Sequence, residues 1–334
     1  MRDRNRAGVF LGIAGAFTLA LSQVSVYAAS SSTKSAPTSS NQTLKVSPLR
    51  SSVTIQPGQS AKVQTFVTNL TKASLMVKPI ENDFVAGDER GDPAVVLDPN
   101  SYAPTHSLKR FMVPLQDVTI PAGATKEVDV TISVPKTAQA GGYFGAVRFA
   151  PDTGGNSSSV SLGASVVSLI LMTVPGPAVE QLTLTNFDVQ QNGGTASNFR
   201  TSDSLSLLMR FQNKGNLQEA PFGQVYVQKG KKILYTYNFN QKDPKDQILP
   251  DSARRWTVPL KGLGKFGKYT VGATFTYGTK GQSIEISKTI WIIPTAYILA
   301  IVGAVILLAL LIGGGYVFLK SYKRKILRSS RRRY

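Results

Sequence analysis

Few residues of this chain have the chemistry of a catalytic site. His106 is the only histidine, it lies in the proline-containing segment Tyr102–Ser107, and the chain has no cysteine. A Ser–His–Asp triad is possible in composition, but no Gly-x-Ser-x-Gly turn is present to expose a nucleophilic serine. The lack of cysteine excludes thiolate catalysis, cysteine zinc sites and iron–sulfur clusters. The sequence therefore predicts a non-catalytic protein that uses no cofactor.

Acidic residues gather between Glu81 and Thr105, where a metal ion could be held. They are Asp83, Asp88, Glu89, Asp92 and Asp98. Oxygen-rich loops can bind Ca²⁺, but the run from Asp88 to Asp92 lacks the alternating ligands of an EF-hand. Solvated loop acids are the more ordinary interpretation, and we expect no metal site.

The same segment is the best candidate for a binding loop. It is long and rich in Asp, Pro and Gly, and such loops inside a compact domain tend to be functional or disordered. The candidate contact residues are Phe84 and Tyr102, near its ends, with Asp88 and Asp92 between them. Interfaces favour Tyr, so Tyr102 is the stronger candidate. Phe84 directly follows a predicted strand, and filling the core is the alternative role for its ring.

The elements that must position these residues have the pattern of short β-strands. Residues 127–134 alternate strictly, with Val128, Val130, Ile132 and Val134 on one face. Other strands are expected at 62–68, 75–80 and 110–115, with a short one at 94–97. No segment before residue 290 has helical periodicity. Many short strands separated by turns predict a β-sandwich or a barrel.

Sequence landmarks recur in the same order in two halves of the chain. A strand ends in Asn69 in the first half and in Asn213 in the second, and Gly-x-Tyr-x₅-Phe occurs around Tyr143 and around Tyr269. A Tyr that begins a late strand can hydrogen-bond backbone in the preceding loop, as in the tyrosine corner of immunoglobulin-like domains. We therefore predict an all-β ectodomain made of two tandem immunoglobulin-like antiparallel β-sandwiches, at residues 44–174 and 175–290.

The two ends of the chain predict export and membrane anchoring. Residues 1–28 resemble a signal peptide with cleavage between Ala28 and Ala29, followed by a flexible Ser/Thr linker at 29–43. An uncleaved N-terminal anchor is the alternative. Residues 292–319 have the length and apolar character of a transmembrane helix, and a buried core helix is the alternative.

The net charge of +19 is unevenly distributed. The tail at 320–334 holds eight basic residues and no acid, which predicts a cytoplasmic tail and an extracellular N-terminal ectodomain. Its position beside a membrane span explains this basic run, so nucleic-acid binding is not expected. The exported part is mildly basic, which suits anionic wall polymers or lipid surfaces without naming a partner.

Several of these motifs carry a family resemblance. Residues 44–48, Pro57-Gly58, Asn69, Asp83-Phe84 and the run 141–147 resemble the first ectodomain of the WxL-interacting proteins of Gram-positive bacteria. That family has a signal peptide, two β-sandwiches, one C-terminal span and a basic tail. The resemblance implies peptidoglycan binding by the distal sandwich and protein binding by the membrane-proximal one.

Two function classes follow for the chain. The first is a single-pass, non-catalytic cell-surface protein whose sandwiches bind cell-wall polymer, another exported surface protein, or both. The alternative is a membrane-tethered, chaperone-like assembly factor for exported proteins. Periplasmic pilus chaperones, which are also tandem immunoglobulin-like domains, lend a strand to an incomplete subunit and use a basic cleft between their domains.

Overall fold

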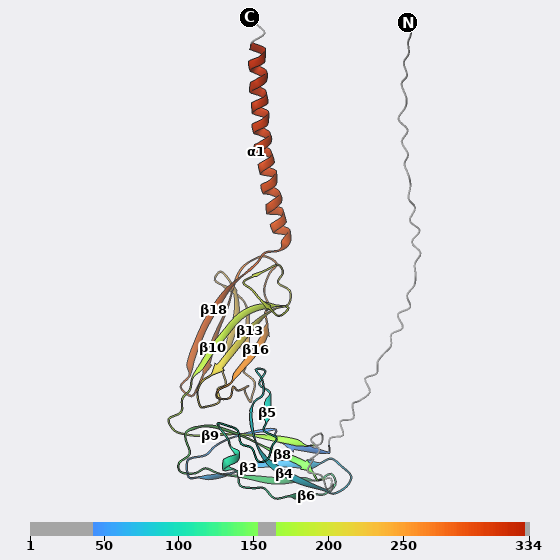
Figure 1. Ribbon diagram of the computed structural model, residues 1–334, viewed down its shortest axis with the longest axis vertical. Helices are drawn as coiled ribbons and strands as arrows, with labels where there is room; N and C mark the ends of the chain where they lie inside the picture. Colours follow the sequence, from blue (N-terminus) through green and yellow to red (C-terminus); the bar gives the residue numbers. More distant parts are fainter. Residues whose placement is uncertain (1–42, 153–164, 331–334) are drawn as a thin grey trace, which may run out of the picture. The chain divides into compact units, whose positions relative to one another are not determined.

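The computed structural model describes residues 43–152 and 165–330 of the chain. Within these ranges eighteen strands form four sheets, and one long helix follows them (Figure 1). The predicted signal peptide, its Ala28–Ala29 cleavage point and most of the predicted linker lie outside the described residues.

Strands β1 to β9 form the first sandwich. Its smaller sheet has the order β1 (Leu44–Ser47), β3 (Ser60–Asn69) and β7 (Thr125–Ser133). Its larger sheet has the order β2 (Arg50–Thr54), β9 (Val166–Val174), β8 (Gly141–Pro151), β4 (Leu75–Ala86) and β5 (Pro93–Val95), and β6 (Val118–Ile120) also pairs with β4. Alternate residues of β7, namely Val128, Val130 and Ile132, are buried between the sheets, as their period of two predicts.

The first strand of this sandwich is divided between the two sheets. Strand β1 pairs with β3 in antiparallel orientation, and after Pro48 the chain continues as β2, which pairs with β9 in parallel. Pro48 has no N–H to donate, so it fits the point where the chain leaves one ladder and enters another. As a result, β2 is the terminal strand of the larger sheet.

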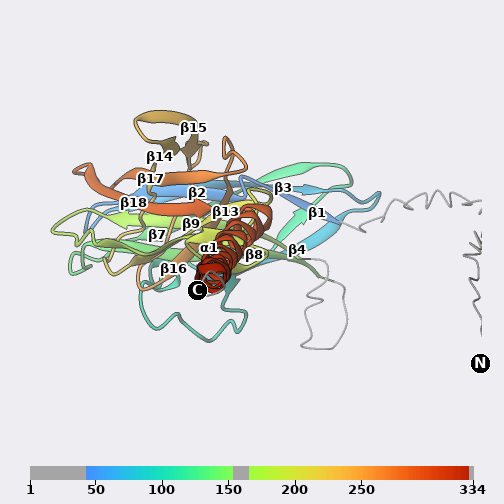
Figure 2. The same cartoon turned by 90° about the horizontal axis from the view of Figure 1, so that it is seen from above.

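Strands β10 to β18 form the second sandwich. One sheet has the order β11 (Gly194–Thr195), β10 (Leu182–Gln191), β13 (Leu205–Asn213) and β16 (Ala253–Pro259). The other has the order β12 (Asn198–Phe199), β18 (Gln282–Ile292), β17 (Gly267–Tyr277), β14 (Phe222–Lys229) and β15 (Lys232–Phe239), with the β14–β15 hairpin at its edge (Figure 2). Phe211, Phe239 and Phe275 meet between the sheets, with ring centroids 5.1–6.1 Å apart.

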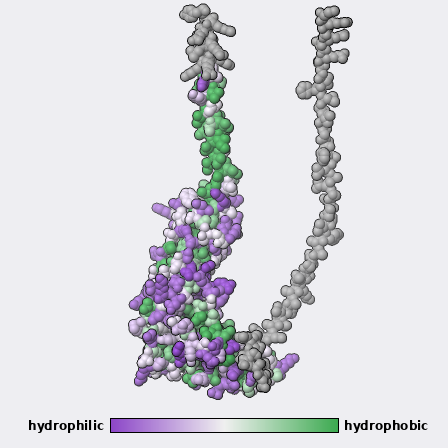
Figure 3. Space-filling view, in the orientation of Figure 1, coloured by the Kyte–Doolittle hydropathy of each residue, from purple (hydrophilic) through white to green (hydrophobic). Residues whose placement is uncertain are grey.

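The C-terminal helix α1 (Thr295–Ser330) begins three residues after the position expected from the sequence. Residues up to Ile292 belong to β18, where Ile290 and Ile292 are buried in the second core. Pro294 follows two residues later and suits the start of a helix, because it needs no partner for an N–H. Residues Thr295–Tyr322 are long and apolar enough to span a membrane, and their side chains are exposed around the helix (Figure 3).

The predicted fold class is confirmed: two β-sandwiches precede one long apolar helix. One local expectation is wrong, because the segment expected as a strand at 110–115 starts with a 3₁₀ turn at Lys109–Phe111. The Lys109 N–H donates to the carboxylate of Asp83, a residue on β4, at 2.9 Å. This long-range bond joins the 3₁₀ turn to β4, and the alternation of apolar residues gave no sign of it.

Candidate functional site

Asn69 and Asn213 occupy matching environments at the ends of β3 and β13. Both are fully buried, and each amide group donates to the carbonyl oxygen of an isoleucine in the other half of its domain, Ile120 for Asn69 and Ile248 for Asn213, at 3.0 Å. Each side-chain oxygen accepts the N–H of the residue two positions later. These amides join two loops of each sandwich, which is a structural arrangement and leaves no donor free for a ligand.

The two tyrosines also hydrogen-bond backbone of a preceding loop. The hydroxyl of Tyr143 donates to the carbonyl of Gln139 at 2.9 Å. The hydroxyl of Tyr269 donates to the carbonyl of Phe266 at 3.2 Å and accepts the N–H of Gly264 at 3.0 Å. Tyr269 is buried, whereas Tyr143 is half-buried, so the second sandwich has the more extensively bonded tyrosine.

The candidate binding loop at 81–105 is more ordered than its composition indicates. Strand β4 continues to Ala86 and pairs with β5, so the first six residues of the segment are sheet. Asp83 is fully buried and accepts the N–H groups of Ala103 and Lys109 at 2.8 and 2.9 Å. Phe84 is 4% exposed and contacts Phe144 edge to face, so its ring belongs to a small core that also borders the pocket described below.

Of the other three candidate residues, Asp92 and Tyr102 are exposed and Asp88 is half-buried, and both aspartates line the pocket described below. Asp88 and Asp92 both form ion pairs with Arg90, at 2.7 and 3.5 Å, and Asp88 also caps the turn. The hydrogen bond from Arg90 lowers the pKa of Asp88. Tyr102 is 48% exposed, and the cations of Lys109 and Arg110 lie 4.9 and 4.5 Å from its ring centroid.

Glu89, at the tip of the β4–β5 hairpin, connects the two sandwiches. Its carboxylate forms ion pairs with Arg210 on β13 at 2.8 Å and with Arg255 on β16 at 2.6 Å. Its carbonyl accepts the N–H of Arg255 at 2.5 Å, which satisfies one backbone group at the outer edge of β16. Hydrogen bonds from Arg210 and Arg255 lower the pKa of Glu89. The carboxylate is therefore charged throughout the neutral range.

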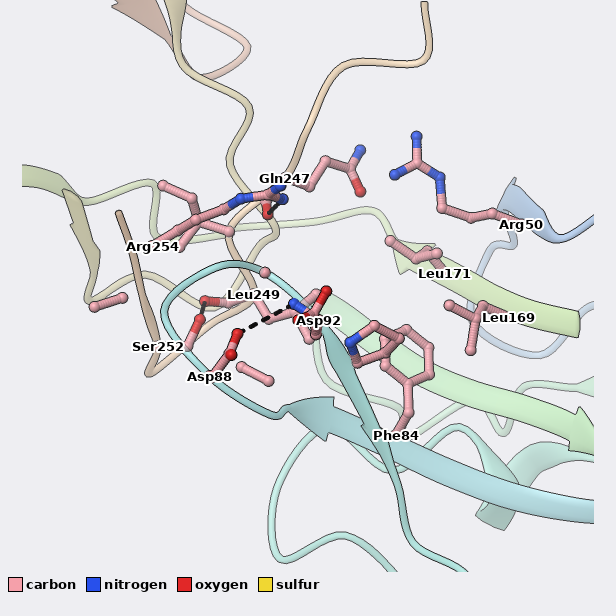
Figure 4. Close-up of a pocket in the computed structure, with 15 residues that line it drawn as sticks. Arg50, Phe84, Asp88, Asp92, Leu169, Leu171, Gln247, Leu249, Ser252 and Arg254 are labelled. Atoms are coloured by element: carbon pink, nitrogen blue, oxygen red, sulfur yellow. Dashed lines mark hydrogen bonds between the residues drawn. The ribbon is translucent and has the colours of Figure 1, made fainter. Parts of the chain in front are cut away.

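A small pocket with an accessible volume of about 80 Å³ lies beside this connection, between the sandwiches. Its apolar lining includes Phe84, Leu169, Leu171 and Leu249, and its polar lining includes Arg50, Asp88, Asp92, Gln247 and Arg254 (Figure 4). Such a lining can accept an apolar side chain and orient it by a few polar contacts.

The two arginines of the pocket differ in whether their charge is paired with an acid. Arg254 forms an ion pair with Asp246 at 3.1 Å, and its guanidinium lies 4.9 Å from the ring centroid of Trp256. Arg50 donates one hydrogen bond, at 3.3 Å, to the carbonyl of Lys245 and has no acidic partner among the described residues. Arg50 is therefore the positive charge that remains available to an incoming anion.

His106 has a structural environment. Its Nδ1 lies 2.7 Å from the carbonyl oxygen of Gly142, and its ring packs near Tyr143 and Phe144. Asp251 and Ser252 lie at the same hollow, but Ser252 donates to the carbonyl of Leu249 instead. Among the described residues no hydrogen bond joins His106 to an acid or a hydroxyl, and no group of three metal-ligating side chains occurs.

Three of the four binding-loop candidates, Phe84, Asp88 and Asp92, line the pocket, but sequence reasoning did not find its other residues. Arg50, Leu169 and Leu249 come from three distant segments, and each belongs to an unremarkable strand or turn. Glu89, beside the pocket, also had a signal as an acid in a long loop, but its two arginine partners lie 121 and 166 residues further along the chain.

Comparisons with known proteins show similarity of fold alone. No family model matches the chain, and no curated protein sequence matches it. Among solved structures, a chaperone–tip adhesin complex of CFA/I fimbriae biogenesis has a TM-score of 0.38 and 14% identity, over 75% of this chain and 99% of that one. The E. coli chaperone DraB has a TM-score of 0.30 and 16% identity, over 74% of this chain and 96% of that one. At these values the similarity assigns no function.

Proposed function

We propose that this protein is a membrane-anchored, chaperone-like binding protein that holds an extended segment of an exported protein. The observation that supports the proposal is the open edge of β2, which begins at the pocket between the sandwiches. Arg50, the first residue of β2, lines that pocket, and its register partner on β9 is Leu169, another lining residue.

The free hydrogen-bonding groups of β2 can be identified from its pairing. The Leu169 N–H donates to the carbonyl of Leu49, and the Ile55 N–H donates to the carbonyl of Thr173. Backbone groups alternate along a strand, so odd-numbered residues of this segment face β9. The N–H and C=O groups of Arg50, Ser52 and Thr54 therefore face away from the sheet. No described residue pairs with them.

An open edge beside an apolar pocket is the arrangement used in strand addition. Backbone hydrogen bonds supply affinity, and pockets for alternate side chains supply specificity. A partner strand on β2 would reach the pocket with one apolar side chain, and Arg50 would attract an acidic side chain or a terminal carboxylate. An exported protein is the partner class that we propose, on the basis of this edge and pocket and not of the similarity in fold.

The wall-polymer hypothesis has less support from the candidate loop. Phe84 and Asp88 line the pocket beside β2, and Glu89 belongs to the contact between the sandwiches. Tyr102 is exposed but has cations near its ring. Wall binding is therefore the competing outcome in the experiment below.

The proposal is tested with the full chain and two substitutions at one position. Ser52→Pro removes an N–H from the open edge and leaves the β9 ladder intact, whereas the matched control Ser52→Ala keeps that N–H. A photo-crosslinking amino acid at Thr54 should form an adduct with an exported protein in intact cells. We expect Ser52→Pro to reduce the adduct at least tenfold and Ser52→Ala to leave it unchanged.

Two results would contradict this function. An equal adduct yield in both variants would show that the edge of β2 is not used. Sedimentation of the chain with purified cell wall, without any adduct at position 54, would favour the wall-polymer hypothesis instead. Circular dichroism of both variants checks that each remains folded.

A further inference from the structure

The end of the second sandwich from which α1 emerges is strongly basic. Six cations lie in its loops and at the strand ends beside them, with a single acid. The cations are Arg200, Lys229, Lys231, Lys232, Lys261 and Lys265, and the acid is Asp203. The loops at the opposite end (175–181, 214–221, 240–252 and 278–281) hold four cations and five acids. The excess positive charge is thus a property of one end and not of the whole sandwich.

Strand register places these residues together. Gly267, the first residue of β17, pairs with Ile292, the last residue of β18, so the loop at 260–266 lies at the end of the sandwich where β18 finishes. Strand β14 ends at the same side, and Lys229 donates to the carbonyl of Phe266 at 3.3 Å. The residues around Phe199 lie at this end of the sandwich too, because the Ile293 N–H donates to the carbonyl of Phe199.

The chain itself keeps this end near α1. Only Ile293 and Pro294 separate β18 from the first residue of the helix, Thr295, so the distance is limited to roughly 10 Å by backbone geometry. If α1 spans a membrane, as the proposed function requires, the surface of that membrane lies directly beside the basic loops.

Exposed apolar side chains accompany the cations. Ile233, Phe266 and Trp291 are 58, 48 and 41% exposed, and the ring of Phe266 stacks on that of Tyr297 in the first turn of α1 with centroids 4.9 Å apart. Aromatic rings of this kind favour the headgroup layer of a membrane. The loop that carries Phe266 is held by the buried hydroxyl of Tyr269, which bonds Gly264 and Phe266.

We propose that this end of the second sandwich is a docking site for anionic lipid headgroups of the membrane that holds α1. The cations named above would contact the headgroup phosphates, while Phe266 and Trp291 would enter the interfacial layer. Each Lys or Arg near an anionic surface contributes roughly fivefold to the affinity, so several together can hold the sandwich against the lipid. The proposal rests on the anchoring role of α1 but not on the binding of a partner at β2.

The lack of cysteine in the chain allows a direct test. The full chain with Ser202→Cys is labelled with a fluorophore at the basic end, and a second preparation carries the label at Thr279→Cys at the opposite end. Both are placed in nanodiscs of phosphatidylcholine alone, or of phosphatidylcholine with an equal amount of phosphatidylglycerol. Each disc contains a lipid with a nitroxide headgroup as the quencher.

We expect quenching at position 202 to be at least threefold stronger with phosphatidylglycerol and to be lost in high salt, with no quenching at position 279. Replacing Lys231, Lys232, Lys261 and Lys265 by Gln should abolish the difference between the lipids. The matched control replaces Lys214, Lys242, Lys245 and Lys280 by Gln and should leave it unchanged.

Equal quenching at position 202 in the two lipid compositions would overturn the docking site. So would an equal loss of the lipid-dependent quenching in both quadruple variants. Failure of the chain to enter nanodiscs would overturn it together with the anchor. The adduct with an exported protein at position 54 of β2 is measured separately. Its absence can therefore be distinguished from a loss of lipid docking and from a failure of membrane insertion.

Discussion

Buried polar side chains of this protein differ in how well their hydrogen-bonding groups are satisfied. Asn69 and Asn213 have every group paired, whereas one carboxylate oxygen of Glu219 has no partner among the described residues. Its other oxygen accepts the N–H of Gly278 at 3.1 Å. Burial, and then the charge of Glu180, raise the pKa of Glu219 from 4.5 to about 7.

This raised pKa predicts a pH-dependent stability. The folded state binds the proton of Glu219 more tightly than the unfolded chain does, so the contribution to stability is complete below about pH 4.5. It is lost progressively as the pH rises from there to about 7. We expect Glu219→Gln to unfold at a higher denaturant concentration than the wild type above pH 7. Chemical denaturation at several pH values measures this, and identical midpoints at pH 8 would contradict it.

A second prediction at this scale concerns the two tyrosines, whose role in holding loops stays a prediction. Tyr→Phe removes a net hydrogen bond, which typically contributes about 0.5–1.5 kcal/mol. Tyr269 is buried and its hydroxyl has two partners, so Tyr269→Phe should lower the free energy of unfolding more than Tyr143→Phe. If neither variant changes the melting temperature, the hydroxyl groups have no stabilising role.

At the scale of elements, the β4–β5 hairpin has a role that its composition did not indicate. Its tip contributes Glu89, which binds Arg210 and Arg255 and provides a carbonyl for the edge of β16. The ion pairs are half-exposed, so we expect less than about 1 kcal/mol of stability from each. We expect these contacts mainly to restrict the two sandwiches relative to each other and thereby to maintain the pocket.

We therefore expect Glu89→Gln to broaden the distribution of distances between the sandwiches without lowering the melting temperature by more than about 3 °C. Electron–electron distance measurements between labels at Lys72→Cys and Ser283→Cys report this in the cysteine-free chain. Asp92→Asn is a matched control on the same hairpin, because the ion pair that Asp92 forms within the described residues is with Arg90. Equal distributions for wild type and Glu89→Gln would show that the hairpin does not restrain the sandwiches.

At the scale of the whole molecule, the orientation in the membrane remains a prediction. The basic tail favours a cytoplasmic C-terminus, and the basic end of the second sandwich does not oppose this, because folded domains are translocated largely regardless of charge. Protease added to intact cells should remove the sandwiches and spare an epitope placed after Tyr334. Loss of that epitope would reverse the orientation.

The sequence by itself determined the features that depend on short stretches of chain. Alternation at Val128, Val130 and Ile132 predicted a strand with one buried face, and the uncharged run before Lys320 predicted a helix able to span a membrane. Composition also excluded thiolate chemistry. Each of these follows from periodicity or from the kinds of residue present, which need no knowledge of distant contacts.

Only the tertiary structure decided what the candidate loop does and where a pocket lies. Phe84 is buried because Phe144, sixty positions away, lies against it. Glu89 forms its ion pairs with arginines on two strands of the other sandwich. The edge of β2 became significant only when its pairing with β9 showed which backbone groups stay free. Such outcomes depend on the free energy of contacts between residues far apart in the chain, and local patterns do not encode those contacts.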